Sequence, residues 1–442
     1  MKLDSHFLLT KPFREHHFYG EGGEYIDESE LAVIPNPILF KEGKPEQFCV
    51  QINVNRKLQT QYYVGVDWLT KEKAIYVEPK LNGSEVQTNY FEMLFAALSL
   101  PEAAQYATDL YEIKLERPSI SIKQSQDLLT PLLVVAYLNM LKEIVRKGLK
   151  KSYYKVEHNL YGRVKGKVMV GKTIKENALK NKTLHTWCSY DEFGINGLEN
   201  RLLKKALVFI KRYLPSIKHL HAETYTEQVF NYISPAFEEV SEKVSLHDIM
   251  HTKPNAFYKD YTEALRLAKM ILQRFGYNIS NTSTQKTTTP PFWIDMSKLF
   301  EFYVLGKLKA AGYPILYQKR MGYDIPDYLL KDERLILDAK YKTYYSEDGM
   351  NESVATDIRQ LAGYGRNEKV RSYFGITSET QPKLMIIYPN QTMPDEITKG
   401  VLFTQGRPIP NYYNMRKVSV KLPMIKSAPN IKPLLRDEEI HG

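Results

Sequence analysis

Cysteine is scarce in this chain, and its scarcity excludes one class of domain. The 442 residues include 2 cysteines, Cys49 and Cys188, with no CxxC pair and no Cys/His cluster. A structural zinc site is built from such clusters of thiolate and imidazole ligands, so we expect none. Sparse cysteine without a disulfide pattern is typical of a reducing compartment, and we expect a cytoplasmic protein.

Long hydrophobic runs are also missing. The first residues, MKLDSHFLLTKPFREHHF, are charged throughout and lack the apolar core of a signal peptide. The longest apolar run, residues 128–141, contains Pro131 and Asn139 and is too short to span a bilayer. We therefore expect no membrane partner and assign this run to a buried helix.

The excess of positive charge is small. Lys and Arg number 61 against 51 for Asp and Glu, a net charge of +10 that is spread along the chain. This balance suits a nucleic-acid partner without proving one. The hydrophobic content of 43% is enough for packed cores, and the length predicts two or three domains.

Residues 1–110 are predicted to form a β-rich N-terminal module. Short β-branched and aromatic runs alternate with Gly, Pro, Lys and Asn, as in VIPNPILF, QFCVQINV, YYVGVDWL and AIYVEPKL. This pattern indicates a small barrel or sandwich that contacts a partner. A plain scaffold is an equally open interpretation, because no catalytic spacing occurs here.

Residues 111–280 are predicted to form a mainly helical middle domain. Apolar residues recur with helical spacing in 125–151, 197–214 and 258–275. Basic residues at its edge are candidates for DNA contact, although a solvated face is the alternative: Arg146, Lys150, Lys165 and Lys167. The Ser-, Thr- and Asn-rich stretch 276–291 predicts a linker.

A phosphate-binding loop is mimicked at residues 166–173. GKVMVGKT fits the G-x-x-x-x-G-K-[ST] pattern, which needs a buried strand before it and a helix after it. The preceding residues are polar, and Val168 and Val170 alternate as in a strand. We therefore do not interpret the segment as a nucleotide site.

The chemistry is concentrated in residues 323–341, YDIPDYLLKDERLILDAKY. Asp338 and Lys340 would share one face of a strand, and a turn at 331–334 would bring Asp327 beside them from an antiparallel strand. Two carboxylates suit Mg²⁺, and the lysine can orient water and offset transition-state charge. The arrangement matches the P-D…(D/E)-x-K signature of metal-dependent nucleases, and an ordinary surface hairpin is the alternative.

Helices are predicted on both sides of this hairpin. Glu301 lies on the first, residues 296–311, and is a candidate metal ligand beside Asp327 and Asp338, with a solvated glutamate as the alternative. The second, 353–366, places Asp357, Gln360 and Tyr364 on one face, where Gln360 could orient the lysine. The order helix, strand, hairpin, helix, strand predicts an αβββαβ PD-(D/E)xK core in residues 292–442, within a multidomain α+β protein.

Four stretches, in order, resemble the McrC family, the nuclease subunits of McrBC-type 5-methylcytosine restriction systems. They are AIYVEPKL; NLYGRVKGKVMVGKTI with CSYDEFGINGLENRLLKKAL; FWIDMSKLFEFYV; and PDYLL…LILDAKYK with DIRQLAGYGR. The resemblance implies Asp327, Asp338 and Lys340 as the catalytic trio, with Glu301 and Gln360 in support. It also implies that the phosphate-loop lookalike has no nucleotide role, because the family places a G-[RK]-[VI] segment there.

The resemblance further implies partners that this chain does not contain. These are a McrB-like AAA+ GTPase hexamer, whose ring the N-terminal portion enters to stimulate hydrolysis, and double-stranded DNA. The expected function is that of a Mg²⁺-dependent endodeoxyribonuclease subunit in anti-phage restriction. Two alternatives stay open: an adaptor that activates a ring NTPase with a silent or conditional nuclease, and a stand-alone repair nuclease of the same superfamily.

Overall fold

The computed structural model describes residues 13–19, 37–52, 57–70, 73–81, 86–98, 109–114, 116–123, 129–213, 223–244, 259–280, 286–342, 345, 352–377, 380–391 and 395–426. The chain divides into two compact units, one of residues 1–120 and 290–442 and one of residues 121–289. The predicted multidomain α+β class is confirmed. The first and last predicted domains lie together in the first unit.

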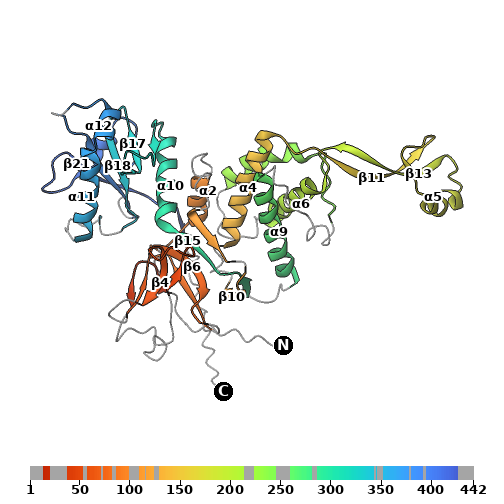
Figure 1. Ribbon diagram of the computed structural model, residues 1–442, viewed down its shortest axis with the longest axis horizontal. Helices are drawn as coiled ribbons and strands as arrows, with labels where there is room; N and C mark the ends of the chain where they lie inside the picture. The colour runs from red at the N-terminus through yellow and green to blue at the C-terminus, as the bar shows by residue number, and fades with distance from the viewer. Residues whose placement is uncertain are drawn as a thin grey trace, which may run out of the picture. The chain divides into compact units, whose positions relative to one another are not determined.

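A five-stranded sheet joins these two segments of the first unit (Figure 1). Its strand order is β1 (Phe13–Arg14), β7 (Ala74–Glu78), β6 (Tyr63–Trp68), β15 (Phe292–Asp295) and β9 (Tyr111–Ile113). β15 pairs antiparallel with both neighbours. A Cβ on Gly65 would lie 2.0 Å from the Phe292 carbonyl oxygen, so this close pairing requires glycine in β6.

Smaller sheets complete the N-terminal part of this unit. The four-stranded sheet has the order β2 (Phe18–Tyr19), β5 (Leu58–Thr60), β4 (Phe48–Ile52) and β3 (Ile38–Leu39). β8 (Val86–Thr88) pairs with β22 (Met424–Lys426). Helix α2 (Tyr90–Leu98) packs against α10 (Met296–Ala310). The predicted β-rich character of the first hundred residues is thus observed.

A six-stranded mixed sheet forms the C-terminal part of the unit. Its order is β16 (Leu316–Tyr317), β17 (Tyr328–Leu330), β18 (Leu335–Ala339), β19 (Lys383–Pro389), β21 (Met415–Val420) and β20 (Arg407–Pro408). β18, β19 and β21 run parallel, and the remaining pairs are antiparallel. The helices that accompany it are α11 (Glu352–Arg366), α12 (Glu368–Phe374) and α13 (Leu402–Gln405).

The parallel strands are apolar because both faces of the sheet are covered. On one face α11 contributes Val354, Ile358 and Leu361 to a core shared with Ile336 and Ile386. α10 contacts β18, and the side chains that it buries include Leu299, Phe300 and Tyr303. Helix α10 ends before Gly312, whose φ of +82° suits glycine. The sequence predicted both this helix and its end.

The second unit is a helical bundle that carries a long hairpin. Its helices are α4 (Leu129–Lys147), α6 (Leu198–Tyr213), α7 (Glu223–Ile233) and α9 (Lys259–Ser280), with a 3-10 turn at Ser234–Phe237. α9 packs against α4 and α6. The run 128–141 contributes to α4 and is buried there, as predicted. β10 (Ile120–Lys123) pairs with β14 (Lys286–Thr289) where the chain enters and leaves this unit.

The hairpin, which we call the arm, was not predicted. It consists of β11 (Ser152–Tyr161) and β13 (His185–Gly194), with β12 (Lys167–Val168), α5 (Val170–Glu176) and a 3-10 turn (Ala178–Lys180) at its far end (Figure 1). The linker prediction for 276–291 was too simple. α9 continues to Ser280 and β14 begins at Lys286, although the unit boundary does fall in this stretch.

Candidate active site

Asp327 and Asp338 meet because of the register of two strands. β17 pairs with β18 so that Tyr328 lies opposite Leu337. One step further along both strands places Asp327 opposite Asp338. The Asp327 carboxylate accepts a hydrogen bond of 2.9 Å from the backbone N–H of Ala339. The turn at 331–334 therefore brings Asp327 beside Asp338 from an antiparallel strand, as predicted.

Lys340 follows β18 directly and joins the same group. Its Nζ lies 2.7 Å from Asp338 Oδ2 and 3.8 Å from Asp357 Oδ1. Its backbone N–H donates to Ile387 of β19 at 2.9 Å, so the sheet fixes the main chain at this residue. Asp338 is 2% exposed, and the Lys340 side chain is 15% exposed. The Lys340 side chain is thus partly exposed to solvent while it pairs with a buried carboxylate.

The polar face of α11 supports both lysines of this segment. Gln360 Oε1 accepts a hydrogen bond of 2.9 Å from Lys340 Nζ, and its amide nitrogen donates to the Tyr364 hydroxyl at 2.8 Å. Asp357 accepts from Lys342 Nζ at 2.6 Å. The structure therefore brings together the three helix residues that the sequence placed on one face.

Glu301 of α10 is fixed by several donors. Its Oε2 accepts from Lys298 Nζ at 2.8 Å, from Gln318 Nε2 at 2.7 Å and from the Tyr317 hydroxyl at 3.2 Å. Tyr317 and Gln318 were not predicted from the sequence. Lys298 precedes Glu301 by three residues, so helical spacing alone could have indicated that pair.

Burial and repulsion between nearby carboxylates disfavour the ionised forms of Asp327 and Asp338. Burial, together with the charges of Glu301 and Asp338, raises the pKa of Asp327 well above its ordinary value. Burial also raises the pKa of Asp338, and the contacts with Lys340 only partly offset it. For Lys340, burial lowers the pKa, but the ion pair with Asp338 outweighs burial and the pKa is raised. Additional positive charge at this place would stabilise the ionised carboxylates.

The donor set fits Mg²⁺ better than a softer metal. Within the described residues, no three side chains of His, Cys, Asp or Glu converge on one point. Mg²⁺ does not need such a cage, because it is commonly held by one or two carboxylates together with water and substrate phosphate. Asp327 and Asp338 could supply such carboxylates, and Glu301 adds negative charge nearby, as its effect on the pKa of Asp327 indicates.

The phosphate-loop lookalike is not built as a nucleotide site. β12 pairs antiparallel with β13, and α5 has 7 residues. Lys172 Nζ lies 2.9 Å from Glu157 Oε2 and 3.7 Å from the centre of the Trp187 ring. The Thr173 hydroxyl accepts from the Trp187 backbone N–H at 3.0 Å. The side chains that would contact phosphate and metal instead stabilise the arm.

Three of the four basic candidates for DNA contact are paired inside their own unit. Arg146 lies 2.7 Å from Glu143, Lys150 lies 2.6 Å from Glu199, and Lys165 lies 3.9 Å from Glu192. Lys167 is exposed in β12. Their assignment to DNA stays a prediction.

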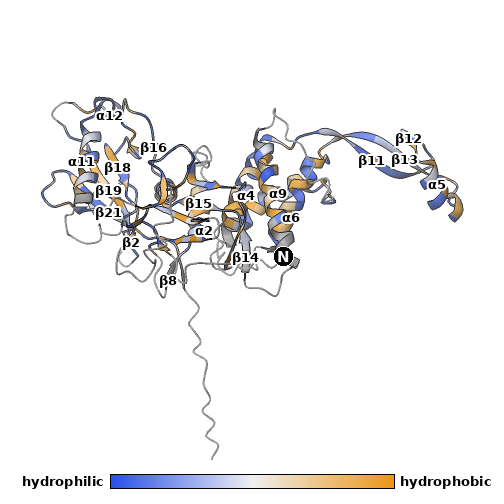
Figure 2. Cartoon of the chain, turned by 60° about the horizontal axis from the view of Figure 1, so that its bottom comes forward, coloured by the Kyte–Doolittle hydropathy of each residue, from blue (hydrophilic) through white to orange (hydrophobic). Residues whose placement is uncertain are grey.

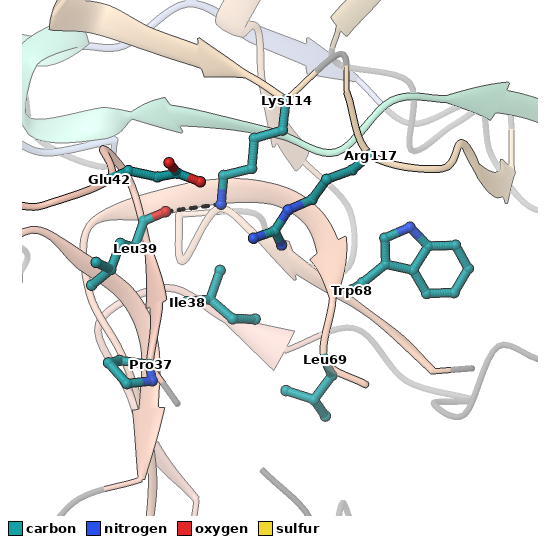
Figure 3. Close-up of a pocket in the computed structure, with 8 residues that line it drawn as sticks. All are labelled: Pro37, Ile38, Leu39, Glu42, Trp68, Leu69, Lys114 and Arg117. Carbon is teal, nitrogen blue, oxygen red and sulfur yellow. Dashed lines mark hydrogen bonds between the residues drawn. The ribbon is translucent and has the colours of Figure 1, made fainter. Parts of the chain in front are cut away.

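A cavity of about 330 Å³ lies in the N-terminal part of the first unit (Figure 3). Its lining residues are Pro37, Ile38, Leu39, Glu42, Trp68, Leu69, Lys114 and Arg117. Lys114 and Arg117 both pair with buried Asp67, at 2.6 and 3.1 Å, and Lys114 also donates to the Leu39 carbonyl. These cations neutralise Asp67, so we assign them to the stability of the sheet and not to a ligand.

The fold and site define a mixed α+β protein with two adjacent acids and a lysine at the end of a central strand. Residues 58–389 match the model of a family described as McrBC 5-methylcytosine restriction system component. This match covers most of the chain, and the chain belongs to that family. It is therefore a component of a restriction system. None of the helices that the structure describes has the length and hydropathy of a membrane span.

Two solved structures are also similar at low scores. One is the refined half-complex from a tetradecameric assembly of Thermococcus gammatolerans McrB AAA+ hexamers with bound McrC, with 14% identity, coverage of 93% of this chain and 94% of that chain, and a TM-score of 0.35. The other is the Thermococcus gammatolerans McrBC complex, with 14% identity, coverage of 69% and 89%, and a TM-score of 0.28. At these scores neither likeness carries an argument. No curated protein matches the chain.

Proposed function

We propose that this chain is the DNA endonuclease subunit of its restriction system, equivalent to McrC, and hydrolyses phosphodiester bonds with Mg²⁺. The observation that carries the proposal is the convergence of Asp327, Asp338 and Lys340 at the end of β18. The element order from α10 to β19 supports a PD-(D/E)xK core. Family membership supplies the biological context.

Each residue has a separate task in this proposal. Asp327 and Asp338 would hold Mg²⁺, which would supply positive charge beside the attacking water and the phosphate. Lys340 donates hydrogen bonds to the attacking water and to the charge that develops on the phosphate. Asp338 and Gln360 orient Lys340, and Glu301 contributes negative charge beside Asp327.

The experiment is cleavage of double-stranded plasmid DNA by the full chain, with and without a co-expressed AAA+ GTPase, in Mg²⁺ and GTP. Asp338→Asn should abolish cleavage and retain stimulation of the partner GTPase. Cleavage at the wild-type rate by a folded Asp338→Asn protein would refute the nuclease assignment. Cleavage by the wild-type chain alone would favour a stand-alone nuclease.

A second function, activation of a McrB-like AAA+ GTPase ring, is favoured by the arm. Six of the ten β11 residues are exposed and most β13 residues are half-buried, and hydrophobic residues are mixed with hydrophilic ones toward the far end of the arm (Figure 2). The exposed apolar side chains there include Tyr161, Ile174, Leu179 and Leu184. Exposed apolar groups on this narrow sheet, which is two-stranded along most of its length and gains β12 near its end, indicate a surface for a partner.

The arm is tested by Leu179→Ser together with Ile174→Ser. We expect stimulation of the partner GTPase to fall, while the thermal midpoint of the chain changes little because Leu179 is 78% and Ile174 is 50% exposed. The matched control is Val401→Ser, which changes an exposed apolar residue of the first unit. Equal stimulation by all three proteins would exclude this role of the arm. Contact through the N-terminal module stays a separate proposal.

A further inference from the structure

The main chain after Lys340 turns sharply and is held from the N-terminal sheet. The Lys342 backbone N–H donates to the Lys340 carbonyl at 2.8 Å, which closes a tight turn around Tyr341. The Tyr341 side chain is 3% exposed, and its ring centre lies 5.7 Å from that of Phe300 in α10. Lys80, which follows β7, donates from Nζ to the Tyr341 carbonyl oxygen at 2.8 Å.

The Lys80 amine is enclosed by aromatic rings. Its Nζ lies 4.2 Å from the centre of the Tyr341 ring and 4.3 Å from that of Tyr62. The backbone N–H of Lys80 donates to the buried carboxylate of Glu15 at 3.2 Å. Burial lowers the pKa of Lys80 to about 8, although the charge of Glu15 opposes this shift. Burial of an ammonium group is costly, and here the group contacts the Tyr341 carbonyl and the rings of Tyr341 and Tyr62.

This contact has a geometric consequence for the active site. β18 ends at Ala339, and the Lys340 N–H still bonds to Ile387 of β19, so the sheet holds the N-terminal side of Lys340 and the turn that follows holds its carbonyl side. The Lys340 side chain must reach Asp338 and Gln360 together. A shift of the Lys340 Cα, which both sides hold in place, would move its Nζ relative to both.

We propose that Lys80 is a positioning residue for Lys340, so that the N-terminal sheet completes the nuclease site by holding the Tyr341 carbonyl. The proposal rests on the proposed nuclease function. Lys80 touches neither DNA nor the acidic pair in this assignment and acts through the main chain of residues 340–342. Loss of its amine should lower the rate of the chemical step and leave DNA binding intact.

The variant is Lys80→Met, which keeps the aliphatic stem and removes the donor. Lys114→Met is the control for general destabilisation of this module, because it also removes an Nζ donor to a main-chain carbonyl, that of Leu39 at 2.9 Å, and in addition leaves buried Asp67 with one fewer cation. The full chain with its AAA+ partner is assayed under single turnover at saturating DNA and Mg²⁺. We expect the Lys80→Met rate constant to fall about tenfold or more, with the dissociation constant for DNA unchanged.

Partial recovery of the rate by Lys80→Arg would distinguish positioning from general damage. Equal losses in Lys80→Met and Lys114→Met, or a wild-type rate in Lys80→Met, would overturn the proposal. If Lys80→Met does not fold, Lys80→Gln takes its place, because it keeps an N–H donor on a shorter stem. Its rate should fall below that of the wild type, because the shorter stem places the donor farther from the Tyr341 carbonyl, and a wild-type rate would again overturn the proposal.

A second measurement does not depend on cleavage. Hydrogen–deuterium exchange of the peptide covering residues 335–342 reports the amides of Lys340 and Lys342, which are bonded to Ile387 and Lys340 carbonyls. Exchange should be faster in Lys80→Met than in Lys114→Met. Unchanged exchange would overturn the positioning role even if the wild-type chain cleaves DNA. If the wild-type chain does not cleave, the nuclease assignment fails separately.

Discussion

The carboxylate of Asp327 accepts a hydrogen bond from the backbone N–H of Ala339 at 2.9 Å. Ala339 is the residue between Asp338 and Lys340, so one bond fixes the first acid against the strand that carries the other two groups. The bond also helps to hold a second negative charge beside Asp338, where burial raises the pKa of both carboxyls.

Asp327→Asn should lower DNA cleavage while it raises the stability of the folded chain. The amide oxygen can still accept from the Ala339 N–H, and the amide replaces a carboxyl whose ionisation is opposed by burial and by the charges of Glu301 and Asp338. We expect cleavage to fall at least ~100-fold, and the thermal midpoint in metal-free buffer to rise relative to the wild type as the pH is raised. Cleavage assays and differential scanning calorimetry measure the two effects. Asp327→Ala, which loses the bond as well, is the control and should not gain stability. A lowered midpoint in both variants would contradict this account.

Lys340→Met should destabilise the chain as well as inactivate it. The change leaves the 2% exposed Asp338 carboxylate without the cation that lies 2.7 Å away. Breaking a buried ion pair on one side costs about 3–5 kcal/mol. In metal-free buffer, adding Asp338→Asn to Lys340→Met should restore most of the lost free energy of unfolding. Additive losses in this double-mutant cycle would show that the pair is not coupled.

Substitutions of Gln360 and Tyr364, on the polar face of α11, should lower the cleavage rate to different extents. Gln360→Ala removes the acceptor of the Lys340 amine, and Tyr364→Phe removes only the hydroxyl that receives the Gln360 amide. We expect a loss of roughly tenfold for Gln360→Ala and a smaller loss for Tyr364→Phe, measured as single-turnover rates at saturating DNA. A larger effect from Tyr364→Phe would place its hydroxyl in direct contact with substrate instead.

Stability should depend on pH through Asp295, which caps α10 by accepting from the Lys298 N–H at 3.0 Å. Burial, with a contribution from the charge of Glu301, raises the pKa of Asp295 to about 7 from an ordinary 3.8. The folded chain therefore holds a proton between these values that the unfolded chain releases, and stability falls as pH rises through this window.

Asp295→Asn keeps a capping oxygen and removes this titration. Thermal midpoints of the two proteins, measured across the window, should diverge in favour of the variant as the pH rises. Asp295→Ser is a second uncharged cap and should follow the same course. A constant difference between wild type and both variants would show that Asp295 does not titrate here.

The sequence by itself determined the hairpin that carries the candidate site. The spacing of Asp327, the turn at 331–334 and Asp338-x-Lys340 encodes this hairpin over a few residues. Helical periodicity likewise determined α10 and the shared face of Asp357, Gln360 and Tyr364 on α11, because residues three and four apart share a helix face. These features depend on short stretches of chain, so they can be derived without knowledge of the fold.

Only the tertiary structure decided which distant segments support that chemistry. β15 inserts between β6 and β9, and Lys80 reaches the Tyr341 carbonyl across 261 positions of sequence. Such contacts depend on non-local strand pairing, which leaves no periodic signal. The arm escaped prediction for a related reason. Exposure alternates only along residues 152–157 of β11 and 190–194 of β13, and Tyr153, Tyr161 and Phe193 are exposed, so burial separates apolar from polar residues too weakly to indicate strands.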